Sequence, residues 1–240
     1  MFAIFKKELH SFFGSATGYI VIGIFLALNG LLLWIIPGEY NILDAGYANA
    51  DGLFFLAPWL FLFLCPAVTM RCIAEERQTG AWEWLRSKPL SAWAIVGGKY
   101  AASLALVLIA LLPTVIYYFT VSYIAEPQGN IDAGAFWGSF IGLVFLAAVY
   151  VAVGVFASSV ANNQIVAFIT AVVLSFFMLY GFTLIASVSS TGSIADIIEN
   201  IGIQKHYNSM SRGVIDLRDI LYFLIASFVF LFFTERRISK

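Results

Sequence analysis

The chain has 240 residues, of which 61% are hydrophobic and 11% are charged, and its formal net charge is −1. Soluble domains ordinarily have about 45–50% apolar and about 25% charged residues, and so few charges cannot coat a globule. The composition therefore excludes a soluble globular protein and predicts an integral membrane protein, and the nearly neutral balance excludes nucleic acid as a partner.

The first segment, residues 1–18, predicts a short amphipathic helix. Apolar residues recur at helical spacing on one side, and basic residues occupy the other: Phe2, Phe5, Leu9 and Phe12 against Lys6, Lys7 and His10. Such a helix lies in the membrane interface with its apolar face down. The alternative is an extension of the first span, but Gly14 and Gly18 favour a bend between the two.

Six apolar blocks follow, and none contains a Lys, Arg, Asp, Glu or His. One such residue at mid-membrane costs about 2.5–3.5 kcal/mol, so charge-free runs are typical of membrane spans. The blocks are Tyr19–Ile36, Leu53–Met70, Ala101–Ile124, Phe136–Ala157, Ile165–Ser187 and Ile220–Thr234. The last is short, and we expect it to begin near Leu217. The pattern predicts an all-α, polytopic fold with six transmembrane helices in one domain, 1–240.

The distribution of basic residues predicts the orientation. The first apolar run is too long for a cleavable signal, and no small-x-small cleavage site closes it. With both termini in the cytoplasm, only Lys205, Arg212 and Arg218 of the 13 Lys and Arg lie outside. Because basic residues accumulate on the cytoplasmic side, we expect both termini there.

The one substantial cytoplasmic loop, residues 71–99, connects spans two and three. Gly80 can begin a helix of about two turns, and Pro89 ends it. Ser91 is expected to cap a second helix that runs into span three. The loop therefore predicts a compact helical elbow under the membrane.

The extracytoplasmic segment 188–218 is long enough to fold. A linker of small residues, 188–192, leads to a start that resembles a capping box, Ser193 with Asp196, and Gly202 closes the helix. One stripe of this helix is apolar: Ile194, Ile197, Ile198 and Ile201. We expect the stripe to rest on the outer membrane surface or on the neighbouring spans.

Catalysis finds little support in the sequence. His10 and His206 fall on opposite sides of the membrane, so no histidine-based metal site or Ser–His–Asp arrangement is expected. Gly98-Lys99 lacks the first glycine and the Ser or Thr of a phosphate-binding loop. The absence of charge inside the spans argues against an ion-coupled carrier.

Several residues within or near the spans have structural interpretations. Cys65 and Cys72 have no metal or redox spacing and are interpreted as packing residues. Prolines within spans predict kinks packed against neighbours, and small-residue pairs suit close helix contact. These residues are Pro58, Pro66 and Pro113 and the pairs Gly138/Gly142 and Gly154/Ser158.

The elbow, unlike the residues above, has a pattern that packing alone does not explain, because it combines charges with aromatic residues. A solvated loop would account for the charges but not for Trp82, Trp84 and Leu85. Exposed aromatic residues beside mixed charges are typical of a contact surface. We therefore predict that a partner docks here, with Trp82 and Leu85 as the apolar anchor. The candidate contact residues are Glu75, Glu76, Arg77, Gly80, Trp82, Glu83, Leu85 and Arg86.

The elbow resembles the corresponding loop of ABC-2-type transporter permeases. The matching features are an acidic pair followed by Arg77, then Thr79-Gly80, Glu83, Pro89-Leu90 and Gly98-Lys99. This resemblance implies an amphipathic amino-terminal helix, six spans, a coupling helix in the loop after span two, and a long outer segment before span six. The sequence Trp82-Glu83-Trp84 departs from the family's pattern, where less bulky residues surround the glutamate.

Within that family, the chain is most similar to the permease associated with gliding motility. The supporting stretches are Ala57–Trp59, Pro66–Arg71, Gly129–Asp132, Ser158–Phe168 and His206–Asp219.

The resemblance implies a non-catalytic permease subunit of an ATP-driven exporter in the bacterial cytoplasmic membrane. Its expected partners are a cytosolic ABC ATPase subunit, a second permease chain (identical or related) and the lipid bilayer. It implies no cofactor in this chain, with ATP and Mg on the ATPase. The alternatives are a structural or regulatory anchor of a motility or secretion apparatus, then a polytopic enzyme, then a secondary carrier.

Overall fold

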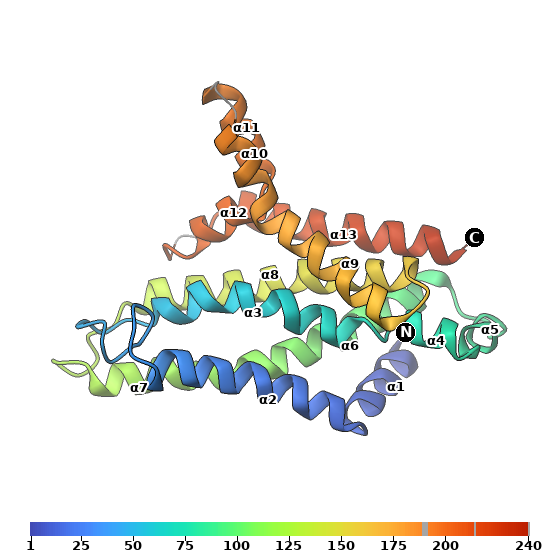
Figure 1. Ribbon diagram of the computed structural model, residues 1–240, viewed down its shortest axis with the longest axis horizontal. Coiled ribbons are helices and arrows are strands. Elements are labelled where there is room, and N and C mark those ends of the chain that lie inside the picture. The colour runs from blue at the N-terminus through green and yellow to red at the C-terminus, as the bar shows by residue number, and fades with distance from the viewer. Residues whose placement is uncertain (189–191, 214, 240) are drawn as a thin grey trace.

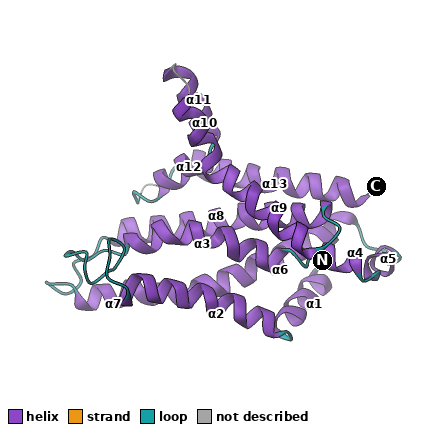
Figure 2. Cartoon of the chain, in the orientation of Figure 1, coloured by secondary structure: helices purple, strands orange, loops and turns teal. Residues whose placement is uncertain are grey.

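The computed structural model describes residues 1–188, 192–213 and 215–239. In these residues all regular structure is helical (Figures 1 and 2), and six helices are long and apolar enough to cross a membrane. They are Ala16–Ile35, Asp51–Gln78, Ala92–Ile124, Ala133–Val160, Gln164–Val188 and Leu217–Ser239. The predicted fold class and number of spans are confirmed. The helices are longer than the apolar blocks, because helical hydrogen bonds continue to pair the backbone N–H and C=O groups where the chain leaves the hydrocarbon.

Three of the spans change helix type along their length. Span one consists of α2 (Ala16–Gly30) followed by a π turn, η1 (Leu31–Ile35). Span three consists of α6 (Ala92–Leu111), the 3₁₀ turn η2 (Leu112–Val115) and α7 (Ile116–Ile124). Span five consists of α9 (Gln164–Phe176), the π turn η3 (Phe177–Gly181) and α10 (Phe182–Val188). Pro113, where a kink is predicted, lies in η2 and has no N–H to donate. Pro58 and Pro66, in contrast, lie inside the unbroken α3 (Asp51–Thr69).

Span four, α8 (Ala133–Val160), is the centre of the bundle. It packs against α3, α6, α9 and the last helix, α13 (Leu217–Ser239). Gly154 lies against the side chain of Thr69 on α3, and a Cβ at Gly138 would stand 2.7 Å from the Cα of Gly213. The predicted small-residue pairs thus serve close contacts inside the chain.

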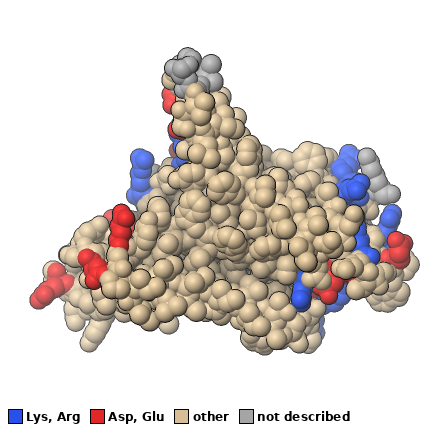
Figure 3. Space-filling model, viewed as in Figure 1, with Lys and Arg blue, Asp and Glu red and all other residues tan. Residues whose placement is uncertain are grey.

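One end of the bundle carries both termini (Figure 1). Here lie α1 (Phe2–Phe13), α4 (Ala74–Gln78) and α5 (Ala81–Arg86). We call it the elbow end, and the opposite end the far end. Lys and Arg gather at the elbow end, whereas the far end is mainly acidic (Figure 3). The break at Gly14–Ser15 confirms that α1 is separate from the first span.

The segment between spans five and six contains two helices. The predicted helix is α11 (Gly192–Ile201), which pairs with α10 in a hairpin that projects from the side of the bundle (Figure 1). Ile197 and Ile201 are exposed, so the alternative that the stripe packs on neighbouring spans is wrong for these two. The predicted linker falls partly on residues 189–191, outside the described residues, as do the side chains of Ser193 and Ile194.

The second of these helices, α12 (Ile203–Met210), was not predicted. It packs against α8 and buries Ile203, Tyr207 and Met210. These apolar positions are spaced three and four apart, which is a helical signal in itself. The Tyr207 hydroxyl donates a hydrogen bond of 2.7 Å to the Phe54 carbonyl of α3.

Candidate functional site

The elbow begins at a break in the helix of span two. Between α3 and α4 the backbone turns, which leaves backbone N–H and C=O groups without helical partners. A serine of α8 forms hydrogen bonds with three of them. The Ser158 hydroxyl accepts hydrogen bonds from the N–H groups of Ile73 and Ala74, each at 3.0 Å, and donates to the Met70 carbonyl at 3.2 Å. The break is therefore anchored to the central helix of the bundle.

A cluster of four charged side chains joins the elbow to the amino-terminal helix. Lys99, on α6, is fully buried, and its Nζ lies 2.8 Å from Glu8 Oε1 and 2.9 Å from Glu76 Oε2. The approach to Glu76 is an ion pair without hydrogen-bond angles. Lys99 also donates to the Cys72 carbonyl, and Lys7 binds Glu76 at 2.5 Å. We name Lys7, Glu8, Glu76 and Lys99 the charge cluster; it connects α1, α4 and α6.

The sequence analysis missed the charge cluster, because Lys99 stands there at the cytoplasmic edge of span three, where a charge needs no buried partner. Two signals pointed to it. Glu8 is the single acidic residue in the basic segment 1–18. Gly98 lets α1 approach α6, since a Cβ there would meet Ile4 at 2.9 Å. A buried lysine needs such paired carboxylates, because an unpaired buried charge is costly.

The structure corrects the predicted apolar anchor. Trp82 is 5% exposed and Leu85 is 8% exposed, so the prediction that these side chains are available to a partner is wrong. Both lie on one face of α5, three residues apart, and this face packs inward, with the Arg77 guanidinium 5.6 Å from the centre of the Trp82 ring. Glu76 is also turned inward, to Lys99.

The remaining candidates in the elbow are exposed or half-buried. Gly80, Glu83 and Arg86 are exposed, Glu75 is half-buried, and Trp84 is 67% exposed. Gly80 has φ +77°, the left-handed conformation that favours glycine, and it starts α5 as predicted. Arg77 is half-buried and donates to the Ser159 carbonyl. The exposed surface is therefore a tryptophan surrounded by mixed charges.

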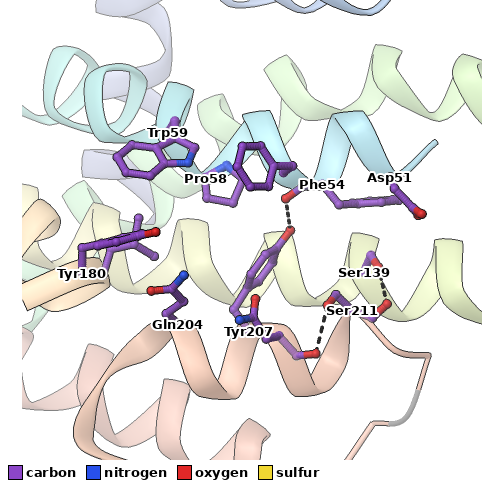
Figure 4. A pocket seen from close by; sticks show the side chains of 12 residues that line it. Asp51, Phe54, Pro58, Trp59, Ser139, Tyr180, Gln204, Tyr207 and Ser211 are labelled. Atoms are coloured by element: carbon purple, nitrogen blue, oxygen red, sulfur yellow. Dashed lines mark hydrogen bonds between the residues drawn. The ribbon is translucent and has the colours of Figure 1, made fainter. Parts of the chain in front are cut away.

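A second candidate is a pocket of about 490 Å³ toward the far end, between α3, α8, α12 and η3 (Figure 4). Its walls combine aromatic rings, amides and hydroxyls, including Trp59, Tyr180 and Gln204. The Ser139 hydroxyl donates to the Ser211 carbonyl at 3.1 Å, and burial raises the pKa of the Tyr207 phenol. Such a lining can hold an amphipathic molecule and offers no activated nucleophile.

The comparisons with known proteins bear on both candidates. Residues 40–234 match the family model described as "ABC-2 family transporter protein". The matched region includes spans two to five, most of span six, the elbow and the far-end pocket. No curated protein matches the chain.

Proposed function

The chain belongs to the ABC-2 family of transporter membrane proteins, and from this we propose that it is the permease subunit of an ATP-driven exporter. A separate cytosolic ATPase subunit would bind the elbow and drive transport. The observation that carries the proposal is the construction of the elbow: Trp84 is exposed on α5, with the exposed charges of Glu83 and Arg86 elsewhere on the same helix, and α5 stands on a support bonded to α1, α6 and α8.

The charge cluster and Ser158 provide a path for force. A displacement of α5 by the ATPase would be transmitted to α4 through Gly80. The helix α4 is bound to α6 by the Glu76–Lys99 ion pair and to α8 by Ser158. Since α6 is the first part of span three and α8 is the whole of span four, movement of the elbow would tilt these two spans. ATP binding and hydrolysis in the partner would thereby change which membrane face the bundle opens to.

Changes on the exposed face of α5 provide the first test. We predict that Trp84→Ala lowers affinity for the ATPase about thirtyfold, because losing a buried aromatic anchor typically costs about 2 kcal/mol. Glu83→Ala should retain the ATPase but weaken the link between ATP hydrolysis and transport. The measurement is co-purification of the ATPase, identified by mass spectrometry, with substrate-stimulated ATP turnover in proteoliposomes.

The control is Tyr123→Ala, which removes an equally exposed aromatic side chain from α7. If Trp84→Ala and Glu83→Ala both keep the partner and the wild-type turnover, the elbow is a solvated loop and the proposal fails. A bound ATPase without stimulated turnover or transport would favour the alternative, a membrane anchor.

We also propose that two permease chains assemble with two ATPases and that the exporter serves gliding motility, from the resemblance of five sequence stretches. The mass of the purified complex gives the number of chains. Normal colony spreading after deletion of the gene would exclude the motility role.

The proposed orientation has the elbow end in the cytoplasm and the complex in the inner membrane. Single cysteines at the exposed positions Ser11, Ser87 and Ser239 should be protected from impermeant thiol reagents in intact cells, and one at Asn130 should be labelled. The buried Cys65 and Cys72 are replaced by alanine in this background. Labelling at position 87 and protection at 130 would reverse the orientation.

A further inference from the structure

Three arginines from three different helices line one pocket at the elbow end. They are Arg77 of α4, Arg86 of α5 and Arg237 of α13, and the pocket has a volume of about 460 Å³. Gly80, Trp82, Glu83 and Ile238 complete its walls. We name this the arginine pocket. It lies between the buried face of α5 and the last turns of α13.

The arginine pocket carries excess positive charge. Within the described part of the chain, none of its three guanidinium groups forms an ion pair with a carboxylate. Glu83 shares the wall but neutralises one charge at most, so the three guanidinium groups leave a net positive charge in the pocket. Because like charges disfavour one another at short range, a bound anion would stabilise this arrangement. Guanidinium groups bind phosphate in a bidentate manner.

An apolar stripe continues from the arginine pocket along α13. Ile225, Val229 and Phe233 are exposed and recur every four residues up to Arg237, so they form one ridge, inclined to the helix axis, that ends at Arg237. The exposed positions lie within the span, where an acyl chain can reach them in the single chain. A cationic group at the end of an apolar stripe matches a phospholipid, with its phosphate at the pocket and an acyl chain on the stripe.

The alternative occupant is a carboxylate of the ATPase. Trp84, the exposed aromatic residue of α5, lies two residues from both Trp82 and Arg86, which places it on the opposite helix face. The arginine pocket thus opens on the side of α5 turned toward α13 and the apolar stripe. We propose that it binds the phosphate of an anionic phospholipid in the leaflet at the elbow end, which holds α5 against α13.

The test uses the purified full-length chain without any ATPase, so its result is independent of the coupling proposal. Native mass spectrometry and thermal unfolding are followed while phosphatidylglycerol or phosphatidylcholine is added in detergent. The wild type should bind phosphatidylglycerol, which is anionic, more tightly than phosphatidylcholine, which has no net charge. Arg86→Gln and Arg237→Gln should each weaken that binding about tenfold, the typical effect of one charge-assisted hydrogen bond. Both side chains are exposed, so neither change should impair folding.

Arg236→Gln is the matched control, because Arg236 lies beside Arg237 but outside the pocket, with its guanidinium over the Phe232 ring. It should change lipid binding less than twofold. Equal losses for Arg236→Gln and Arg237→Gln, or equal binding of both lipids, would overturn the proposal. So would stabilisation by inorganic phosphate equal to that by phosphatidylglycerol. If Arg86→Gln and Arg237→Gln release the ATPase but bind lipid normally, the anion belongs to the partner and the lipid assignment is wrong.

Discussion

Replacing Lys99 with methionine is expected to destabilise the protein by about 3–5 kcal/mol, because it removes one partner from a buried group of charges. Lys99 is the buried cation between the carboxylates of Glu8 and Glu76, whereas Lys7, which also bridges them, is exposed to water and compensates less. Without the Lys99 ammonium group, the tie between α1 and α6 is lost. We expect α1 to detach from α6 and become accessible to protease.

The measurement is thermal unfolding in detergent, together with limited proteolysis near the amino terminus. Lys205→Met is the control, because Lys205 is exposed and outside every ion pair found among the described residues. Combining Lys99→Met with Glu8→Gln and Glu76→Gln should recover much of the loss, since it removes the unpaired charges as well. A single Lys99→Met variant with wild-type stability would show that the cluster contributes nothing to holding α1.

Replacing Ser158 with alanine is expected to cost about 2–3 kcal/mol, since it leaves the buried N–H groups of Ile73 and Ala74 without an acceptor. The lost hydrogen bonds are those that stabilise the break between α3 and α4. We therefore expect faster hydrogen exchange over residues 70–78 and, in the assembled exporter, ATP hydrolysis that drives less transport.

Ser159→Ala is a closely matched control. Ser159 is equally buried, but its hydroxyl donates to Phe156 within its own helix and accepts no bond from the elbow. Its replacement should cost less than about 1 kcal/mol. Equal destabilisation by the two changes would mean that the elbow does not depend on Ser158, and the proposed path to α8 would lose its basis.

The six spans, the separate amino-terminal helix and the family could all be predicted from the sequence. Each of these depends on a property that neighbouring residues share. Hydrocarbon excludes charge from every position of a span, so the boundaries appear as runs without Lys, Arg, Asp, Glu or His. The start of α5 at Gly80 and the cap at Ser91, which accepts a hydrogen bond from Ala94, are equally local.

The tertiary structure decided which side chains of those elements face one another. On a helix as short as α5, the pattern cannot distinguish the face that packs inward from the face that stays exposed: Trp82 and Leu85 are buried, whereas Trp84 is exposed. The charge cluster joins Glu8, Glu76 and Lys99, and the arginine pocket joins residues of α4, α5 and α13. Such groups form only when helices distant in sequence pack together, because ion pairs and anion sites depend on distances of a few ångströms that sequence spacing does not set.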